Sequence, residues 1–320
     1  MMNDTSRPEP VLVDDALLRQ WPLPMPGVEG DKEERGKVLV IAGSREIAGA
    51  AILAGIGVLR AGAGKLAIAT VDSVAPLLAQ AIPEARVIGL PETRSGDLAG
   101  AAAMDKIGGI IGRYGALLIG PGMQNEDAIC DFVAGLLPHL DGRPLLLDAS
   151  AMSVVRQAGG HGKGHGKADD MGNDQPARIS RFDVPVLLTP HAGEMAHLSG
   201  ADKEEVQADP VGAALQAARR WNAVIALKGA VTHIAAPDGR LWRHEGGNVG
   251  LATSGSGDTL AGIVTGLMAR GAPLEQACAW GVALHARAGE RLCQRHGPLG
   301  YLAREILDEI PALMHRLRPQ

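Results

Sequence analysis

The stretch GNVGLATSGSGDTLAGIVTGLMARG, residues 247–271, joins a glycine-rich segment to an apolar one. Small residues and glycines run from 247 to 257, and Asp258 follows them directly. The apolar residues beyond Asp258 recur at helical spacing: Leu260, Ile263, Val264, Leu267 and Met268. This pattern predicts a loop that enters a helix, with Asp258 as the residue that opens it.

The glycines before this helix predict an anion-binding site. Gly255 and Gly257 let the backbone N–H groups of residues 255–257, including that of Ser256, turn toward one point, and the helix dipole adds positive charge there. We expect an anion hole suited to a phosphate. A carboxylate at Asp258 repels an anion, but it suits a general base that takes a proton from an attacking hydroxyl. The alternative is that Asp258 only complements the dipole and that Ser254 or Ser256 is an N-cap.

Upstream of this stretch, short runs rich in Val, Ile and Leu alternate with helix-like segments. The runs span residues 37–43, 65–70, 86–90, 116–120, 144–148, 185–189 and 223–229. The helix-like segments, here and downstream, span residues 48–61, 72–81, 97–108, 126–137, 210–221, 258–270 and 273–295. Continuous hydrophobicity indicates strands covered on both faces. The order predicts an α/β fold with a doubly wound, mostly parallel central sheet and helices on both faces. Ligands in such sheets bind beyond the carboxyl ends of the strands, where the glycine and polar clusters lie.

Two segments depart from this pattern. Residues 1–30 contain five prolines and predict an N-terminal arm, in which LLRQW (17–21) is a candidate docking segment, before one domain over residues 31–320. Residues 159–180 form a low-complexity insertion with His161 and His165. We interpret the insertion as a solvated surface loop rather than a metal site, because the histidines do not share a helix.

Composition excludes several classes of protein. The 46% of hydrophobic residues excludes a disordered chain, and the net charge of −5 with 2% aromatic residues argues against nucleic-acid binding. Three cysteines are too few for a disulfide framework or zinc cluster, which predicts a reducing, cytoplasmic setting. The longest apolar run, residues 50–59, is shorter than the roughly 20 residues of a membrane span, so no membrane association is expected.

Further motifs fall at the ends of the predicted strands. They are GKVLVIAGS (36–44), GAAILAG (49–55), LLIGPGM (117–123), LLLDASAM (145–152), LLTPHAGEMAHL (187–198) and KGAVT (228–232). Together with the glycine-x-glycine-Asp loop, their order resembles the ADP-dependent NAD(P)H-hydrate dehydratases, which form the carboxyl-terminal half of bifunctional hydrate-repair enzymes. The resemblance runs from about residue 30 to about residue 315 and implies a ribokinase-like fold. Many relatives have Thr at the position of Ser256, and Ser keeps the hydroxyl.

The resemblance implies two sets of site residues. The substrate contacts are Ala50, Gly122, His191 and Asp258. The nucleotide contacts are Lys228, Gly229, Ala230, Val231, Thr232 and Gly257. Simpler interpretations stay open: a small-residue crossover at Ala50, a turn at Gly122, a cap or surface group at His191, and a β-hairpin between AVIAL and THIAA.

Two carboxylates near these motifs have less specific predictions. Glu194 follows the strand end in TPHAGE and is a candidate ligand for Mg²⁺, directly or through water. Asp148 is a candidate for positioning the substrate or the metal. A helix cap fits either residue as well.

The implied reaction uses ADP to phosphorylate the hydroxyl of hydrated NADH or NADPH, after which elimination restores the dihydronicotinamide. The preference for ADP over ATP rests on the resemblance alone. Alternatives are a kinase for a vitamin precursor or a sugar, and a non-catalytic nucleotide-binding module, against which an intact GSGD loop argues. The resemblance also implies a homotetramer and a functional partnership with a separate epimerase.

Overall fold

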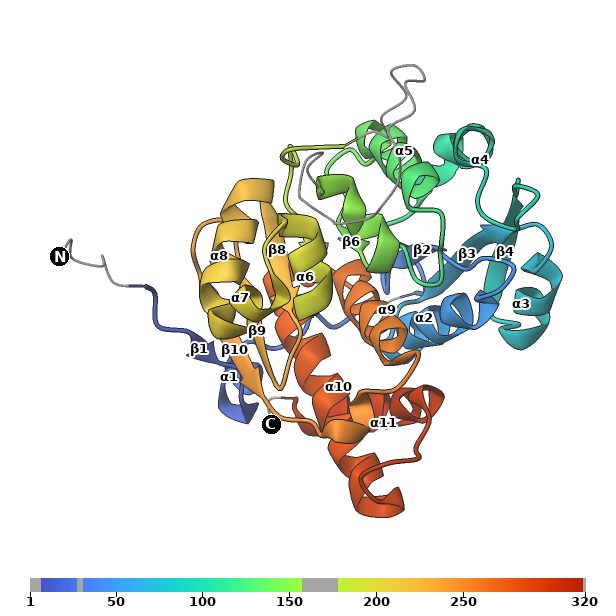
Figure 1. Ribbon diagram of the computed structural model, residues 1–320. Coiled ribbons are helices and arrows are strands. Elements are labelled where there is room, and N and C mark those ends of the chain that lie inside the picture. The colour runs from blue at the N-terminus through green and yellow to red at the C-terminus, as the bar shows by residue number, and fades with distance from the viewer. Residues whose placement is uncertain (1–6, 28–30, 157–177, 319–320) are drawn as a thin grey trace.

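Ten strands form a single sheet in the computed structural model, which describes residues 7–27, 31–156 and 178–318 (Figure 1). The strand order is β1-β10-β9-β8-β7-β6-β5-β2-β3-β4. All seven predicted strands are present, at β2 (Lys37–Ile41), β3 (Lys65–Val71), β4 (Ala85–Leu90), β5 (Ala116–Ile119), β6 (Leu145–Leu147), β7 (Val186–Leu188) and β8 (Ala223–Leu227). These seven pair in parallel, which confirms the predicted mostly parallel sheet.

Three further strands complete one side of the sheet. They are β1 (Val11–Leu12), β9 (Val231–Ala235) and β10 (Leu241–Glu245). β9 runs antiparallel to both β8 and β10, so the hairpin between AVIAL and THIAA is present. β1 pairs in parallel with β10 at the edge.

Side chains on the central strands alternate between two cores. In β2, Val38 and Val40 enter one core and Leu39 and Ile41 enter the other, and all four are at most 1% exposed. Both faces of the sheet are therefore covered, as the continuous apolar runs predicted.

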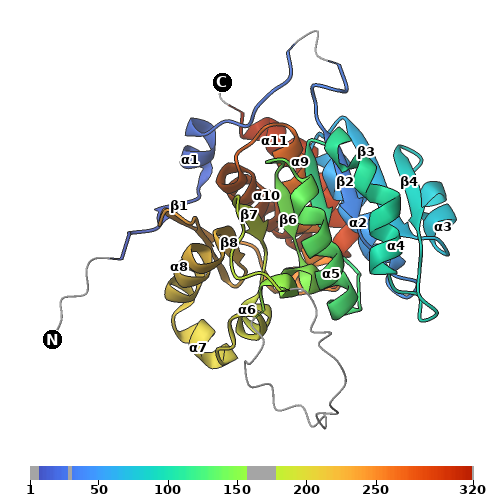
Figure 2. The ribbon, with the colours of Figure 1, turned by 90° about the horizontal axis from the view of Figure 1, so that it is seen from above.

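Helices cover the two faces, as the view in Figure 2 shows. One core receives α1 (Asp15–Gln20), α2 (Ala48–Arg60), α3 (Ala75–Ala81), α9 (Ser256–Ala269), α10 (Leu274–His296) and α11 (Ala303–Arg316). The other receives α4 (Gly100–Ile107), α5 (Glu126–Leu136), α6 (Ala192–Ser199), α7 (Lys203–Ala208) and α8 (Pro210–Trp221). Short 3₁₀ helices lie at Gly108–Arg113, Leu137–His139, Ala149–Val155 and Val249–Leu251.

α9 begins at Ser256, so the prediction that Asp258 opens it was wrong by two residues. Helix ends are set by hydrogen bonding that the apolar pattern does not reveal.

α2 and α9 pack with their backbones in contact. A methyl group on Gly262 would lie 2.1 Å from the Ala54 carbonyl oxygen, and one on Gly266 would lie 2.6 Å from that of Val58. Glycine is required at both positions because no side chain fits between the helices. This packing holds α9 against α2 near the middle of the first core.

The segment that the sequence set apart as an arm contributes to the fold. Val13 N donates to Arg243 O at 2.8 Å, and Leu18 is fully buried. Trp21 stacks on Trp242 with ring centroids 5.9 Å apart. His161 and His165 of the predicted insertion lie outside the described residues. No helix in the described ranges is long and apolar enough to cross a membrane.

Candidate active site

The carboxyl ends of the parallel strands meet at one edge of the sheet, and the predicted site residues follow them. Ala50 lies after β2, Gly122 after β5, Asp148 after β6, His191 after β7 and Lys228 after β8. The first turn of α9 reaches the same edge, because Lys228 Nζ lies 3.7 Å from where a methyl group on Gly257 would be. Parallel strand ends are where α/β sheets bind ligands.

Gly122 and Ala50 are in direct contact. The Gly122 backbone has φ of 69°, and a methyl group there would lie 2.7 Å from Ala50 Cβ and 2.5 Å from the Ile47 carbonyl oxygen. Glycine is therefore required by both conformation and space. The Ala50 side chain is only 4% exposed, so the surface that this pair offers to a ligand is mainly backbone.

Lys228 connects the acidic residues at this edge. Its Nζ lies 3.6 Å from Asp148 Oδ1 and 3.8 Å from Glu194 Oε2. Asp148 is buried and accepts a hydrogen bond of 2.7 Å from Thr189 Oγ1. It occupies the N-cap position of a 3₁₀ helix, but its side chain makes no capping hydrogen bond there. The Asp148 carboxylate is thus directed to Lys228 and Thr189, not to its own helix.

Asp258 has a strongly perturbed carboxyl group. Burial, followed by the nearby Asp148 carboxylate, raises its pKa to about 6, although Lys228 partly opposes both effects. Its side chain accepts no hydrogen bond from the described residues. A largely buried carboxylate without a fixed partner is costly to structure, and a pKa near neutrality suits proton transfer. A chemical role for Asp258, rather than a purely dipole-complementing one, therefore stays the prediction.

The start of α9 has fewer free backbone amides for an anion than the three, at residues 255–257, that the sequence predicted. Gly255 has φ of 88°, and a methyl group there would lie 2.4 Å from Leu53 Cδ1. The Ser256 amide already donates to Thr253 O at 3.2 Å. Among the described residues the amides of Gly255 and Gly257 donate to no acceptor, so these two remain for a ligand.

His285 is a neighbour of this loop that sequence reasoning missed. Its Nε2 lies 3.1 Å from both the Oγ and the carbonyl oxygen of Ser256. Burial lowers the pKa of His285 to about 4, so the ring is neutral near pH 7. The Ser256 hydroxyl therefore faces His285 inside the protein. A single histidine within an apolar helical segment carries no sequence signal of such a contact.

His191 and Glu194 form a capping box at the start of α6. His191 Nδ1 accepts hydrogen bonds from the amides of Gly193 and Glu194, and Glu194 Oε2 accepts one of 2.7 Å from His191 N. The capping alternative thus holds for both residues. Because Nδ1 accepts, a neutral His191 ring carries its proton on Nε2, which can donate to a ligand. A cavity of about 340 Å³ borders both side chains.

A magnesium ion at this edge would need phosphate oxygens of a bound nucleotide among its ligands. Within the described part of the chain, no group of three or more His, Cys, Asp or Glu side chains could hold a metal. Glu194 is engaged by the cap and lies near Lys228. Magnesium accepts one or two carboxylates when phosphates and water supply the other ligands, and Glu194 fits only that arrangement.

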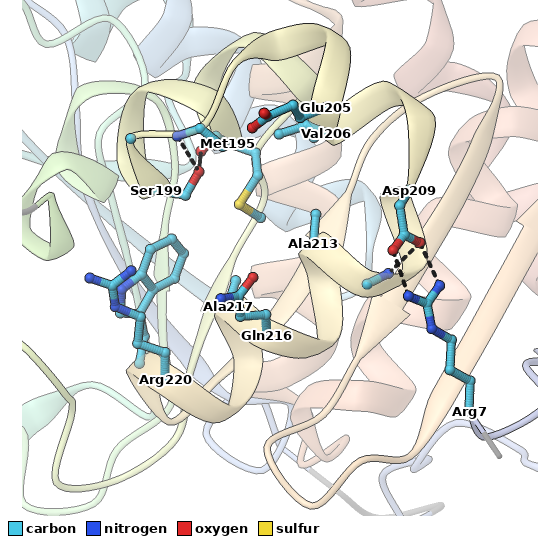
Figure 3. Close-up of a pocket in the computed structure, with 14 residues that line it drawn as sticks. Arg7, Met195, Ser199, Glu205, Val206, Asp209, Ala213, Gln216, Ala217 and Arg220 are labelled. Carbon is cyan, nitrogen blue, oxygen red and sulfur yellow. Dashed lines mark hydrogen bonds and ion pairs between the residues drawn. The ribbon is translucent and has the colours of Figure 1, made fainter. Parts of the chain in front are cut away.

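A larger cavity lies away from this edge, between α6, α7 and α8 (Figure 3). Its volume is about 510 Å³, and Met195, Ser199 and Ala213 line it. At its rim Arg7 bonds the Asp209 carboxylate at 2.7 and 2.8 Å. None of the predicted site residues lines it, so cavity size does not mark the site here.

A family model described as NAD(P)H-hydrate dehydratase matches residues 38–312. The chain belongs to this family. It is 44% identical over 306 residues to the ADP-dependent (S)-NAD(P)H-hydrate dehydratase of Xanthomonas campestris. The aligned region covers 95% of this chain and 96% of that protein. A solved structure of the ADP/ATP-dependent NAD(P)H-hydrate dehydratase from Bacillus subtilis, co-crystallised with ATP and Mg²⁺, aligns with a TM-score of 0.76 at 30% identity. That alignment covers 96% of this chain and 99% of the other.

The family membership decides between the activities left open by the sequence. The dehydratase, a lyase, is favoured over the kinase alternative, and the predicted ribokinase-like fold is confirmed. The bifunctional NAD(P)H-hydrate repair enzyme Nnr of Moorella thermoacetica is 35% identical over 303 residues, and this chain spans 53% of its length. The dehydratase chain therefore corresponds to about half of that enzyme. The roles of individual residues stay predictions.

Proposed function

We propose that this dehydratase converts the S epimer of hydrated NADH and NADPH into NADH and NADPH, and that ADP, giving AMP and phosphate, drives the reaction. The observation that carries the proposal is the unpartnered Asp258 carboxylate beside the start of α9 and Lys228. The names of the relatives support the substrate and the nucleotide.

The first step transfers a phosphoryl group. Asp258 takes the proton of the ring hydroxyl, whose oxygen then forms a bond to the β-phosphorus of ADP. The bond between that phosphorus and the bridging oxygen breaks, and AMP leaves with the electron pair. Because the pKa of Asp258 is raised only to about 6, the carboxylate is ionised at pH 7 yet basic enough to accept a proton.

Lys228 and α9 hold the phosphate in this proposal. Nucleotide contacts over residues 228–232 place ADP against the turn between β8 and β9, and Gly257 lets Lys228 lie beside the helix start. The free amides of Gly255 and Gly257 then face the transferred group. When bound, Mg²⁺ would neutralise phosphate charge, with Glu194 as its protein ligand.

The second step is elimination. The phosphorylated oxygen is a far better leaving group than hydroxide, so the carbon–oxygen bond breaks and phosphate leaves with its electrons. The departing phosphate takes a proton from the neighbouring ring carbon, and the electron pair of that carbon–hydrogen bond forms the restored double bond. Ala50, Gly122 and His191 would hold the hydrated ring between β2, β5 and α6.

Three further features belong to the same proposal. Cys130, Cys278 and Cys293 are all free, which agrees with a reducing, cytoplasmic setting. We also propose a homotetramer and a functional link to an epimerase that supplies the S epimer. The epimerase link is supported by bifunctional relatives of the kind found in Moorella thermoacetica.

Recovery of NADH provides the test. Purified protein is mixed with hydrated NADH, Mg²⁺ and either ADP or ATP, and the absorbance of the dihydronicotinamide is followed. We expect recovery with ADP, with one AMP formed for each NADH. ADP consumption that yields a stable phosphorylated product would identify a kinase, and absence of any turnover would leave only a binding module; either result overturns the proposal. A parallel assay with EDTA tests whether turnover requires Mg²⁺.

A further inference from the structure

A third cavity, of about 590 Å³, lies at the edge of the sheet opposite to the candidate active site. It is bounded by the carboxyl-terminal ends of α2, α9 and α11 and by the chain that follows α1. Its apolar lining includes Leu23, Leu59, Pro311 and Met314. Asp258 lies in the first turn of α9 and Arg270, which lines this cavity, follows its last turn, so the two are about 18 Å apart at 1.5 Å per residue. The cavity is therefore distinct from the candidate active site.

Four arginines line this cavity: Arg35, Arg60, Arg270 and Arg318. Arg60 is neutralised by Asp308, at 2.7 Å. In the described ranges, the other three arginines make no ion pair with a carboxylate. The guanidiniums of Arg270 and Arg35 donate hydrogen bonds to backbone carbonyls instead. Three positive groups, of which Arg270 is partly buried and Arg35 and Arg318 are exposed, thus line one cavity without an ion-paired carboxylate among the described residues.

These positive groups act on one another. Burial lowers the pKa of the Arg270 guanidinium, and the charges of Arg318 and Arg35 lower it further. The charges of Arg35 and Arg318 therefore make the charged form of Arg270 less favourable. An anion between them would remove this repulsion and gain charge-assisted hydrogen bonds.

Helix dipoles account for only part of this arrangement. Arg60 and Arg270 lie at the ends of α2 and α9, and Arg318 follows α11, where positive charge is favourable. Arg35 belongs to no helix; it lies in the turn before β2, yet it lines the same cavity. Dipoles also do not explain why the arginines surround an open volume with apolar walls.

We propose that this cavity binds an amphipathic anion, with a carboxylate or phosphate head among Arg35, Arg270 and Arg318 and an apolar body against Leu59 and Met314. The volume lies within the roughly 300–1,000 Å³ typical of small-molecule sites. Apolar walls with a few convergent charged groups are the usual composition of such sites. The ligand binds without displacing ADP, because the two sites lie at opposite ends of α9.

Calorimetric titration of the full-length protein tests the proposal with four probes. Decanoate and decyl phosphate carry head and body together and distinguish the two head groups, whereas decanol and inorganic phosphate each lack one part. We expect saturable binding of decanoate, decyl phosphate or both, at least tenfold tighter than either partial probe. Binding should persist in the presence of saturating ADP.

Paired variants locate the site. Arg35→Gln and Arg318→Gln should each weaken binding of the best probe by about 10–100-fold, the usual effect of losing a charged hydrogen bond. Arg316→Gln changes an exposed arginine of α11 that does not line the cavity, and it should bind normally. Turnover with hydrated NADH should be unchanged in all three variants.

Several results would overturn the proposal. These are no saturable binding of either amphipathic probe, decanol binding as tightly as decanoate, or displacement of the probe by ADP. Equal weakening in Arg316→Gln would indicate a general charge effect instead. A change in oligomeric state in Arg35→Gln or Arg318→Gln with unaltered probe binding would identify the face as a subunit contact.

Discussion

The two ends of α9 each carry a largely buried charge, but the protein treats these charges differently. At the first turn, the Asp258 carboxylate has no hydrogen-bond partner among the described residues, and its pKa is raised to about 6. After the last turn, Arg270 donates to Ala61 O at 2.9 Å and to Pro24 O at 2.7 Å. Both charges have the sign that the helix dipole favours.

The difference separates a charge that is hydrogen-bonded within the fold from one that is not, and only for the second do we propose a chemical role. Arg270 ties the end of α9 to the chain after α1 and to the end of α2, because two of its five N–H donors are bonded to backbone carbonyls of the fold whether or not an anion is bound. The Asp258 carboxylate has no such bond within the described ranges, and this agrees with our proposal that it acts on a bound ligand. A helix dipole alone therefore does not explain both residues, and variants at the two ends should change different properties.

The largest expected effect is on turnover in Asp258→Asn. Removing the base should lower kcat by about 10²–10⁴-fold, while ADP binds as well as before or slightly more tightly because a negative charge is removed. Steady-state rates and ADP titration measure the two quantities. Asp127→Asn, in the first turn of α5, is the control, and should cost roughly 0.3–1 kcal/mol of stability without loss of turnover. Nearly normal turnover in Asp258→Asn would remove the catalytic assignment.

The next effect is on stability at the other end of α9. Arg270→Met leaves two carbonyl oxygens without their donor, and we expect a loss of about 1–3 kcal/mol in the free energy of unfolding. Denaturant unfolding measures it, with Arg316→Met as the exposed control. Turnover of the folded Arg270→Met protein should be normal. A rate loss comparable with that of Asp258→Asn would contradict the contrast between the two ends.

The smallest effect is a pH-dependent difference in stability. The folded pKa of Asp258, about 6, exceeds its ordinary value of 3.8, so the folded state holds the proton more tightly and loses that stabilisation as pH rises through 6. Asp258→Asn should therefore melt at a higher temperature than the original protein above pH 6, and the difference should vanish near pH 4. His285 has the opposite pH dependence: its pKa is lowered to about 4, so it destabilises the folded protein as pH falls from 6.5 toward 4. Both proteins contain His285, so its contribution cancels in this comparison. Equal differences at pH 4 and pH 8 would show that Asp258 is not buried as described.

Whether a strand or helix could be predicted depended on the pattern of apolar residues in its sequence. β2, β3 and β5 to β8 are buried on both faces and read as continuous apolar runs, and β4, an edge strand that is only partly buried, carries a short apolar run as well, so all seven were predicted. β10 was missed because LWRHE lies beside the edge strand and carries charged residues. α11 was missed because Pro311 interrupts its apolar pattern, although the helix continues through it.

The candidate site was predictable where glycine and strand ends marked it, and not elsewhere. Gly122 and Gly255 have the positive φ that a glycine-rich motif suggests. The contacts among Asp148, Thr189 and Lys228 depend on three strand ends that meet only in the folded sheet. The contact of His285 with Ser256 joins side chains on different helices, and no local pattern encodes it.

The contact between α2 and α9 has a consequence for synthesis on the ribosome. Residues 48–60 emerge early, but the helix against which they pack, residues 256–269, emerges only after about four-fifths of the chain has been made. Until then the nascent chain has neither the Asp258 carboxylate nor the amides of the anion hole. An interrupted translation product thus lacks the residues that we propose act on ADP. The first half of the chain must also keep the apolar face of α2 covered by other means until α9 is made.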